Sequence, residues 1–196
     1  VPFYGFAVVC LDHPVIQGLL PRLRRRVVTY GLNRQADYRA EELRFKGFQT
    51  FFSVYRGDSR LGEIQLDMPG SHNVQNALAT VAACMEMDVP FDVVVKGIAS
   101  FAGVERRFTV RGEVGAAIVV DDYGHHPVEI QATLEGAVAG FPERKVIAVF
   151  QPHRYSRVRD LQADFCRCFN RADHVVVCPV YAAGEAPIEG VDHHSL

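Results

Sequence analysis

The chain has 196 residues, enough for one large domain or two small ones. Hydrophobic residues make up 48% of it and charged residues 22%, which predicts a packed core and excludes an extended disordered chain. The formal net charge is -2, with acidic and basic residues interspersed, so no global field favours nucleic acid or an anionic membrane. No apolar stretch reaches the roughly 20 residues that a membrane-spanning helix needs.

Five cysteines are scattered along the chain, at positions 10, 84, 166, 168 and 178. Cys166 and Cys168 are separated by one residue, whereas common zinc knuckles separate their cysteines by two. Both lie in an apolar helical pattern, so we expect small buried thiols and neither a metal site nor a redox role. Reduced cysteines predict a cytoplasmic protein.

Neither end of the chain carries a terminal signal. The sequence starts at Val1-Pro2-Phe3 without an initiator methionine or a basic leader, and it stops at Ser195-Leu196. We therefore expect an interior fragment of a longer polypeptide. Unpaired sheet edges in such a fragment would favour self-association.

The chain begins with the pattern of a strand–helix–strand unit. Residues 6–11 are an apolar run typical of a buried parallel strand. Residues 12–14, with the sequence Asp-His-Pro, supply a helix start for residues 15–20. Residues 26–30 then form a second strand. This spacing favours α/β architecture.

Residues 37–66 consist of runs of strand-forming residues separated by a turn, a pattern that predicts an antiparallel meander beside the parallel unit. Residues 48–55 are rich in aromatic and β-branched side chains, and a turn at 57–59 leads into a strand at 61–66. After a break at 68–70, Ser71 stands where a helix cap belongs, ahead of apolar residues at helical spacing. A second helix is expected over 91–101.

The remainder predicts a second α/β unit. Residues 103–107 are a short polar joint, which makes 1–103 and 104–196 the expected domains. Beyond it we expect two strands within 108–120 around a turn at 112–115, a helix over 128–138, a strand at 146–150, a helix over 161–169 and a strand at 174–178. Such alternation indicates a largely parallel sheet.

Asn73 and Asn76 stand three residues apart at the predicted start of the first long helix. They therefore share a face beside free backbone N–H groups, where they could read a nucleobase or steady a phosphate. The alternative is an elaborate N-cap with both asparagines solvated. Spacing alone favours the N-cap. At the joint, Arg107 could hold an anion or stack on a base, whereas for Arg106 a solvated hinge is the simpler interpretation.

Residues 121–127, Asp-Asp-Tyr-Gly-His-His-Pro, follow an apolar strand and precede a helix. Open α/β sheets bind ligands at the carboxyl ends of their strands, and these polar groups are costly to bury without partners. We therefore predict a functional loop. Zinc binding by His125 and His126 is disfavoured because adjacent histidines point apart and no further ligand is suitably spaced. No metal site is expected in this chain.

Residues 151–157, Gln-Pro-His-Arg-Tyr-Ser-Arg, again follow a strand directly. Arg154 and Arg157, three residues apart, could form a fork for a carboxylate or phosphate. Basic residues at a helix start oppose the helix dipole unless an anion is present. Their placement therefore favours a binding site over a solvated face.

Taken in order, the polar stretches resemble the Mur ligases over essentially the whole chain. Each motif is weak alone, but the ordered set is specific. The set comprises Pro2-Phe3-Tyr4-Gly5, His72-Asn73-x-x-Asn76, Arg106-Arg107-Phe108, Asp121 to Pro127, Gln151 to Arg157, and Val180 to Ile188.

The resemblance implies an α/β protein of three domains. Residues 1–103 are similar to the last part of the central ATPase domain with its antiparallel subsheet. Residues 104–196 are similar to a truncated, Rossmann-like and mostly parallel C-terminal domain. By the same similarity, Asn73 and Asn76 lie at the adenine side of ATP, and Arg107 and Asp122 reach the nucleotide across the joint. The implied amino-acid site comprises Tyr123, His125, Arg154 and Arg157, with the arginines and His125 on the carboxylate.

The implied reaction is ATP-dependent, Mg²⁺-assisted amide formation between UDP-N-acetylmuramate and L-alanine through an acyl phosphate, in peptidoglycan biosynthesis. The phosphate-loop pattern G-x-x-x-x-G-K-[ST] does not occur in the 196 residues. The family's magnesium ligands and UDP-binding domain also have no counterpart here. We therefore expect the segment to be inactive alone.

Two other functions stay open at this stage. One is the related ligase that attaches a recycled murein tripeptide to the same sugar nucleotide, against which the Gln151-Pro152-His153-Arg154 stretch argues. The other is a non-catalytic module that binds a nucleotide or an amino acid. The missing phosphate loop fits such a module, whereas the abrupt chain ends argue against it.

Overall fold

The computed structural model describes residues 4–196, so Pro2 and Phe3 of the first family-like motif lie outside the described residues. The chain divides into two compact units between Gly103 and Val104. Each unit has a hydrophobic core of its own, assembled from residues of that unit.

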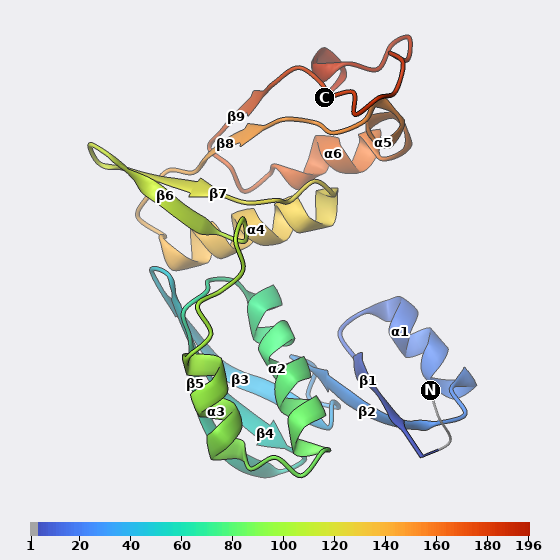
Figure 1. Cartoon of the computed structure of the whole chain (residues 1–196), viewed down its shortest axis with the longest axis vertical. Helices are drawn as coiled ribbons and strands as arrows, with labels where there is room; N and C mark the ends of the chain where they lie inside the picture. The colour runs from blue at the N-terminus through green and yellow to red at the C-terminus, as the bar shows by residue number, and fades with distance from the viewer. Residues whose placement is uncertain (1–3) are drawn as a thin grey trace. The chain divides into compact units, whose positions relative to one another are not determined.

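The first unit is built on a five-stranded mixed sheet in the order β1-β2-β3-β4-β5 (Figure 1). β1 pairs with β2 and β2 with β3 in parallel, whereas β3, β4 and β5 form an antiparallel meander. Both the predicted parallel unit and the predicted meander are therefore present, in one sheet. The strands are β1 (Phe6–Cys10), β2 (Arg26–Gly31), β3 (Tyr38–Lys46), β4 (Gln49–Arg56) and β5 (Ser59–Leu66).

The helices of the first unit include α1 (Pro14–Leu19), which connects β1 to β2 and continues into the short 3-10 helix η1 (Leu20–Arg22). The Nδ1 atom of His13 caps α1 by accepting the N–H of Val15. Helices α2 (Ser71–Met85) and α3 (Phe91–Ala99) pack against each other and against the sheet (Figure 1). The apolar spacing predicted both correctly.

The start of α2 differs from the expectation that Ser71 caps it. Gly70 is the N-cap and Ser71 is the first helical residue. Gly70 has a φ of 99°, a conformation that glycine adopts without the steric cost of a Cβ atom. The backbone therefore turns into the helix at Gly70.

The first core lies between α2 and the sheet. Val74, Leu78 and Val81 on one face of α2 are completely buried, as are Phe52 and Ile64 from the strands. Val74, Leu78 and Val81 follow one another at intervals of four and three residues, the spacing that keeps them on one helical face. This packing fixes the rotation of α2 and hence the direction in which its first turn points.

The side chain of Glu86, directly after α2, is 4% exposed, and its carboxylate contacts residues of β2, β3 and β4. It accepts hydrogen bonds from Tyr38 Oη (2.8 Å) and Arg56 Nη2 (2.8 Å), and it pairs with Arg26. Burial and the bond to Glu86 raise the pKa of Tyr38 above its ordinary value. A buried carboxylate with such partners is satisfied, so this cluster anchors the end of α2 to the sheet.

The second unit contains two separate strand pairs (Figure 1). β6 (Thr109–Val114) and β7 (Ala117–Asp121) form an antiparallel hairpin, whereas β8 (Ile147–Phe150) and β9 (His174–Val177) are parallel. Within residues 4–196, the parallel pairing predicted for this unit is therefore limited to β8 and β9. The mixed α/β class is confirmed for the chain as a whole.

Helices α4 (Pro127–Gly140) and α6 (Gln162–Cys168) pack together over the second core. Phe165 and Cys168 are almost fully buried, and the Phe165 ring lies 5.5 Å from that of Phe150. Cys168 is thus the buried thiol expected, but Cys166 is exposed, which corrects the expectation for that residue. The structure adds α5 (Tyr155–Asp160) and the terminal 3-10 helix η2 (His193–Ser195).

Between residues 4 and 196, no helix is long and apolar enough to cross a membrane. The same residues contain no group of three or more His, Cys, Asp or Glu side chains placed to hold a metal ion.

Candidate functional site

Three polar loops follow strands β7, β8 and β9 in the second unit. The second and third loops are joined by backbone hydrogen bonds, from Arg154 N to Tyr181 O (2.9 Å) and from Tyr181 N to Pro152 O (2.8 Å). The first loop, residues 121–127, follows β7, the second strand of the β6–β7 hairpin. The two stretches singled out at 121–127 and 151–157 therefore both stand at the carboxyl ends of strands of the second unit.

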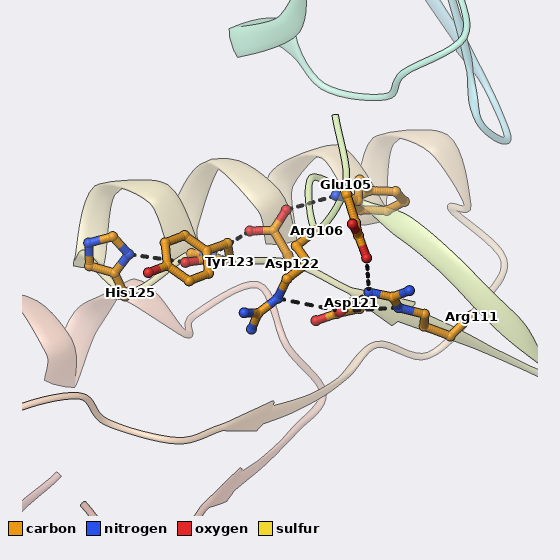
Figure 2. A network of polar contacts seen from close by, with 9 residues as sticks. Glu105, Arg106, Arg111, Asp121, Asp122, Tyr123 and His125 are labelled. Carbon is orange, nitrogen blue, oxygen red and sulfur yellow. Dashed lines mark hydrogen bonds and ion pairs between the residues drawn. The ribbon is translucent and has the colours of Figure 1, made fainter. Parts of the chain in front are cut away.

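Asp122 organises the first loop through backbone N–H groups (Figure 2). Its Oδ2 accepts from Phe108 N at 2.9 Å and its Oδ1 from Gly124 N at 2.7 Å. A Cβ atom at Gly124 would lie 2.9 Å from the same Oδ1, so the turn needs glycine there for space. Asp122 thus fixes the turn, and its remaining lone pairs are available to a ligand.

Arg106 belongs to this cluster, although its guanidinium is half exposed. That group lies 4.8 Å from the centre of the Tyr123 ring, and its Nε lies 3.6 Å from Asp121 (Figure 2). The carbonyl of Arg106 also accepts from Tyr123 N at 2.7 Å. Arg106 is therefore more than the solvated hinge expected, because it holds the Tyr123 backbone and covers its ring.

Tyr123 and His125 project side by side from the first loop (Figure 2). Their rings meet edge to face with centres 5.2 Å apart, and His125 Nδ1 lies 3.0 Å from the Tyr123 carbonyl oxygen. Tyr123 is 51% exposed. A phenol and an imidazole are therefore fixed in orientation but accessible, as a binding site requires.

The neighbouring histidine has a structural role. His126 caps α4 and forms a capping box with Glu129, whose Oε2 accepts from the N–H groups of His125 and His126. Burial raises the pKa of Glu129, but these two hydrogen bonds, together with the charges of His125 and Arg107, leave the pKa below its ordinary value. Arg107 Nη1 lies 3.8 Å from the other oxygen of Glu129. Arg107 thus pairs with the start of α4.

Arg154 and Arg157 flank the first turn of α5. Arg154 is the N-cap of α5. Its φ of 73° lies in the left-handed region, which residues other than glycine rarely adopt. Arg157 Nη1 lies 3.3 Å from both Nδ1 and the carbonyl oxygen of His153. Desolvation and the two arginine charges lower the pKa of His153, so its neutral ring accepts from Arg157.

Glu185 in the third loop is a site residue that the sequence did not single out. Its carboxylate accepts from Ser156 N (2.9 Å) and Ser156 Oγ (2.6 Å). These bonds from Ser156 hold the pKa of Glu185 below its ordinary value. The available signal was an acidic residue within the family-like stretch 180–188, which had no assigned role.

In the first unit, Asn73 and Asn76 occupy the first turns of α2. Asn73 is buried, its Nδ2 donates to Pro69 O at 2.8 Å, and its Oδ1 accepts from Asn76 Nδ2 at 3.5 Å. The solvated alternative is therefore wrong for Asn73, whereas Asn76 is exposed. Asn73 locks the Pro69–Gly70 turn and positions the accessible amide of Asn76.

Asp12, two residues after β1, reaches Gln75 of α2 and was missed as a site residue. Its carboxylate accepts from Leu32 N, from Asn33 N at 2.8 Å and from Gln75 Nε2 at 2.6 Å. A Cβ atom at Gly31 would lie 2.6 Å from Asp12 Oδ1, so the close approach of the two segments needs glycine. Asp12 therefore joins the β1–α1 loop, the β2–β3 connection and α2.

The second unit thus carries five of the predicted site residues on two loops that directly follow strands: Asp122, Tyr123 and His125 after β7, and Arg154 and Arg157 after β8. Two guanidinium groups can bind one carboxylate, and an imidazole beside them can donate a further hydrogen bond. Arg107 pairs with α4, and Asn73 and Asn76 belong to the first unit. The arrangement is suited to a small carboxylate-bearing ligand.

Two family descriptions match consecutive parts of the sequence. "Mur ligase middle domain" matches residues 1–84, and "Mur ligase, glutamate ligase domain" matches residues 106–196. A UDP-N-acetylmuramate–L-alanine ligase of Geobacter sp. (strain M21) is 52% identical over all 196 residues, which span 42% of that protein. The chain therefore spans less than half the length of the curated relatives it matches.

Solved structures show the same relationship. UDP-N-acetylmuramate-alanine ligase MurC from Thermotoga maritima has a TM-score of 0.68 and 33% identity, over 79% of this chain and 34% of that chain. MurF ligase from the same organism, solved in complex with ADP, shares the fold with a TM-score of 0.72 at 22% identity, over 90% of this chain and 40% of its own. With two matched domains that together account for most of its length, the chain belongs to the Mur ligase family.

Proposed function

We propose that the chain is part of an ATP-dependent ligase that joins L-alanine to UDP-N-acetylmuramate in peptidoglycan biosynthesis, in the cytoplasm. The observation that carries the proposal is that Arg154 and Arg157 flank the first turn of α5, directly after β8, and that His125 is held on the loop after β7 of the same unit. Two cations and an imidazole there complement the carboxylate of a free amino acid. The 52% identity to a ligase of that name supports the same substrate.

In the proposed reaction, ATP phosphorylates the carboxylate of UDP-N-acetylmuramate, and the amine of alanine attacks the resulting acyl phosphate. The tetrahedral intermediate then collapses to the amide and releases inorganic phosphate. Arg154 and Arg157 bind the alanine carboxylate, which directs the amine at the other end of the molecule towards the acyl carbon. Holding reactants in this orientation supplies a large part of a ligase's rate enhancement.

The accessible amide of Asn76 is our candidate for contact with the adenine of ATP, with Asn73 holding it in place. The nucleotide contacts implied for Arg107 and Asp122 stay predictions. Mg²⁺ offsets charge on the β- and γ-phosphate oxygens in phosphoryl transfer.

The test is a substrate comparison on the full-length polypeptide whose reading frame contains this segment. Phosphate release is measured with ATP, UDP-N-acetylmuramate and either L-alanine or murein tripeptide. We expect turnover with L-alanine to be the faster of the two. Faster turnover with the tripeptide would assign the recycling reaction instead, and no amino-acid-dependent release with either would indicate a binding module.

A further inference from the structure

The loop of residues 180–187 lies directly against residues 151–157, here called the arginine loop, but has no role in the proposed chemistry. It contacts the arginine loop on both sides of Arg154. On one side, Tyr181 exchanges two backbone hydrogen bonds with Pro152 and Arg154, and its ring stacks on that of His153 with centres 5.4 Å apart. On the other side, Glu185 binds Ser156.

The contact between Glu185 and Ser156 uses both carboxylate oxygens. Oε2 accepts from the backbone N–H of Ser156 at 2.9 Å, and Oε1 accepts from its hydroxyl at 2.6 Å. The two residues are 29 positions apart, so this bond ties together loops that follow different strands. Hydrogen bonds to an ionised carboxylate are the strong kind, and two on one residue fix its orientation.

Such a tie is needed because the conformation of the arginine loop is unfavourable in itself. Arg154 has φ at 73°, which brings its Cβ atom close to neighbouring backbone atoms. Arg154 and Arg157 also repel each other as like charges three residues apart. A strained backbone conformation of this kind persists only when surrounding contacts stabilise it. Such conformations are found most often at ligand-binding sites.

We propose that Glu185 is a positioning residue for substrate recognition. By binding Ser156, it fixes the first turn of α5 so that Arg154 and Arg157 present a preformed pair to the carboxylate of the incoming amino acid. The inference rests on the proposed function, because it takes these arginines as the carboxylate site. Glu185 itself contacts no substrate.

The experiment measures steady-state kinetics of the full-length polypeptide with Glu185→Gln. Glutamine has the same shape but loses the charge and one of the two acceptor oxygens. The KM for L-alanine is expected to rise about tenfold, the scale of a hydrogen bond to a charged group. The KM for ATP should stay within about twofold, because a loss confined to the amino-acid site leaves nucleotide binding intact.

Two further variants make the result specific. Ser156→Ala removes the hydroxyl partner and is expected to raise the KM for L-alanine in the same direction. The double variant should raise it by less than the product of the two single effects, because both changes break one contact. Glu189→Gln removes the same charge from an exposed position four residues further along the chain and should leave both KM values unchanged.

Several results would overturn the inference. An unchanged KM for L-alanine in Glu185→Gln, with Arg154→Ala raising it, would show that the arginines bind substrate without this tie. Equal increases in the KM for ATP and for L-alanine would show a general structural role. If Arg154→Ala also leaves the KM for L-alanine unchanged, the proposed site itself fails. Should Glu185→Gln not fold, Ser156→Ala decides the question by the same criteria.

Discussion

The side chains that form the candidate site are held by partners far away in the sequence. Ser156 and Glu185 are 29 positions apart, and Asp12 and Gln75 are 63 apart. The polar loops 121–127 and 151–157 could be predicted, because each directly follows a strand and carries polar or charged side chains. Burying such side chains without partners costs free energy, so their presence there indicates a site. Glu185 and Asp12 could not be predicted, because a contact between distant segments leaves no local spacing to detect.

The low pKa of Glu185 gives a prediction for stability against pH. A carboxyl group whose pKa is lower in the folded than in the unfolded state stabilises the fold above the unfolded value, which is about 4.5 for glutamate. That stabilisation is lost as pH falls through the lowered folded value. In urea denaturation between about pH 6 and pH 3, wild type should therefore lose more stability than Glu185→Gln. Curves that fall in parallel would contradict this.

At the scale of elements, periodicity predicted the long helices and the meander but not short or irregular features. Helix α5 has six residues, which is too few for an apolar period to emerge, and the helix predicted in this region covered only 161–169. Ser71 looked like a cap because serine favours that position, but the turn at Gly70 needs a positive φ that serine disfavours. Tertiary geometry decided both cases.

The hydrogen bond between Asp12 and Gln75 of α2 predicts that replacing Asp12 lowers the stability of the fold. Asp12→Ala leaves the N–H groups of Leu32 and Asn33 and the amide of Gln75 without this acceptor. Because buried or half-buried donors are costly to leave unpaired, the free energy of unfolding should fall by about 2–3 kcal/mol. Chemical denaturation monitored by circular dichroism measures the change.

The neighbouring His13 provides the control for that prediction. His13 is exposed and caps only the short helix α1, so His13→Ala should cost about 0.5–1 kcal/mol. Equal losses in the two variants would mean that the connection from Asp12 to α2 contributes nothing beyond local capping.

At the scale of the whole molecule, the chain folds as two units with separate cores. Composition and alternation of elements were sufficient to predict a mixed α/β chain. The pairing of strands in the second unit was harder to predict, since apolar runs at 108–120, 146–150 and 174–178 indicate strands without saying which ones pair. The structure joins β6 to β7 antiparallel and β8 to β9 parallel.

Because Phe165 is 1% exposed and packs on Phe150 in the second core, its substitution should lower the stability of that unit strongly. Phe165→Ala should destabilise residues 104–196 by about 3–5 kcal/mol through lost burial and the cavity left behind. Val149→Ala, at a side chain that is 71% exposed, should change stability by less than about 0.5 kcal/mol. Hydrogen exchange read by mass spectrometry locates each effect, and similar protection losses in both variants would refute this assignment of the core.

The central claim is that the strand-end loops of the second unit hold an amino acid by its carboxylate during ATP-dependent ligation. The most direct measurement is phosphate release by the full-length polypeptide with ATP, UDP-N-acetylmuramate and either L-alanine or L-alaninamide, which lacks the carboxylate. The account predicts turnover with L-alanine and a kcat/KM about a hundredfold lower with the amide, since the contacts to two guanidinium groups are lost. Equal kcat/KM values for the two compounds would contradict it.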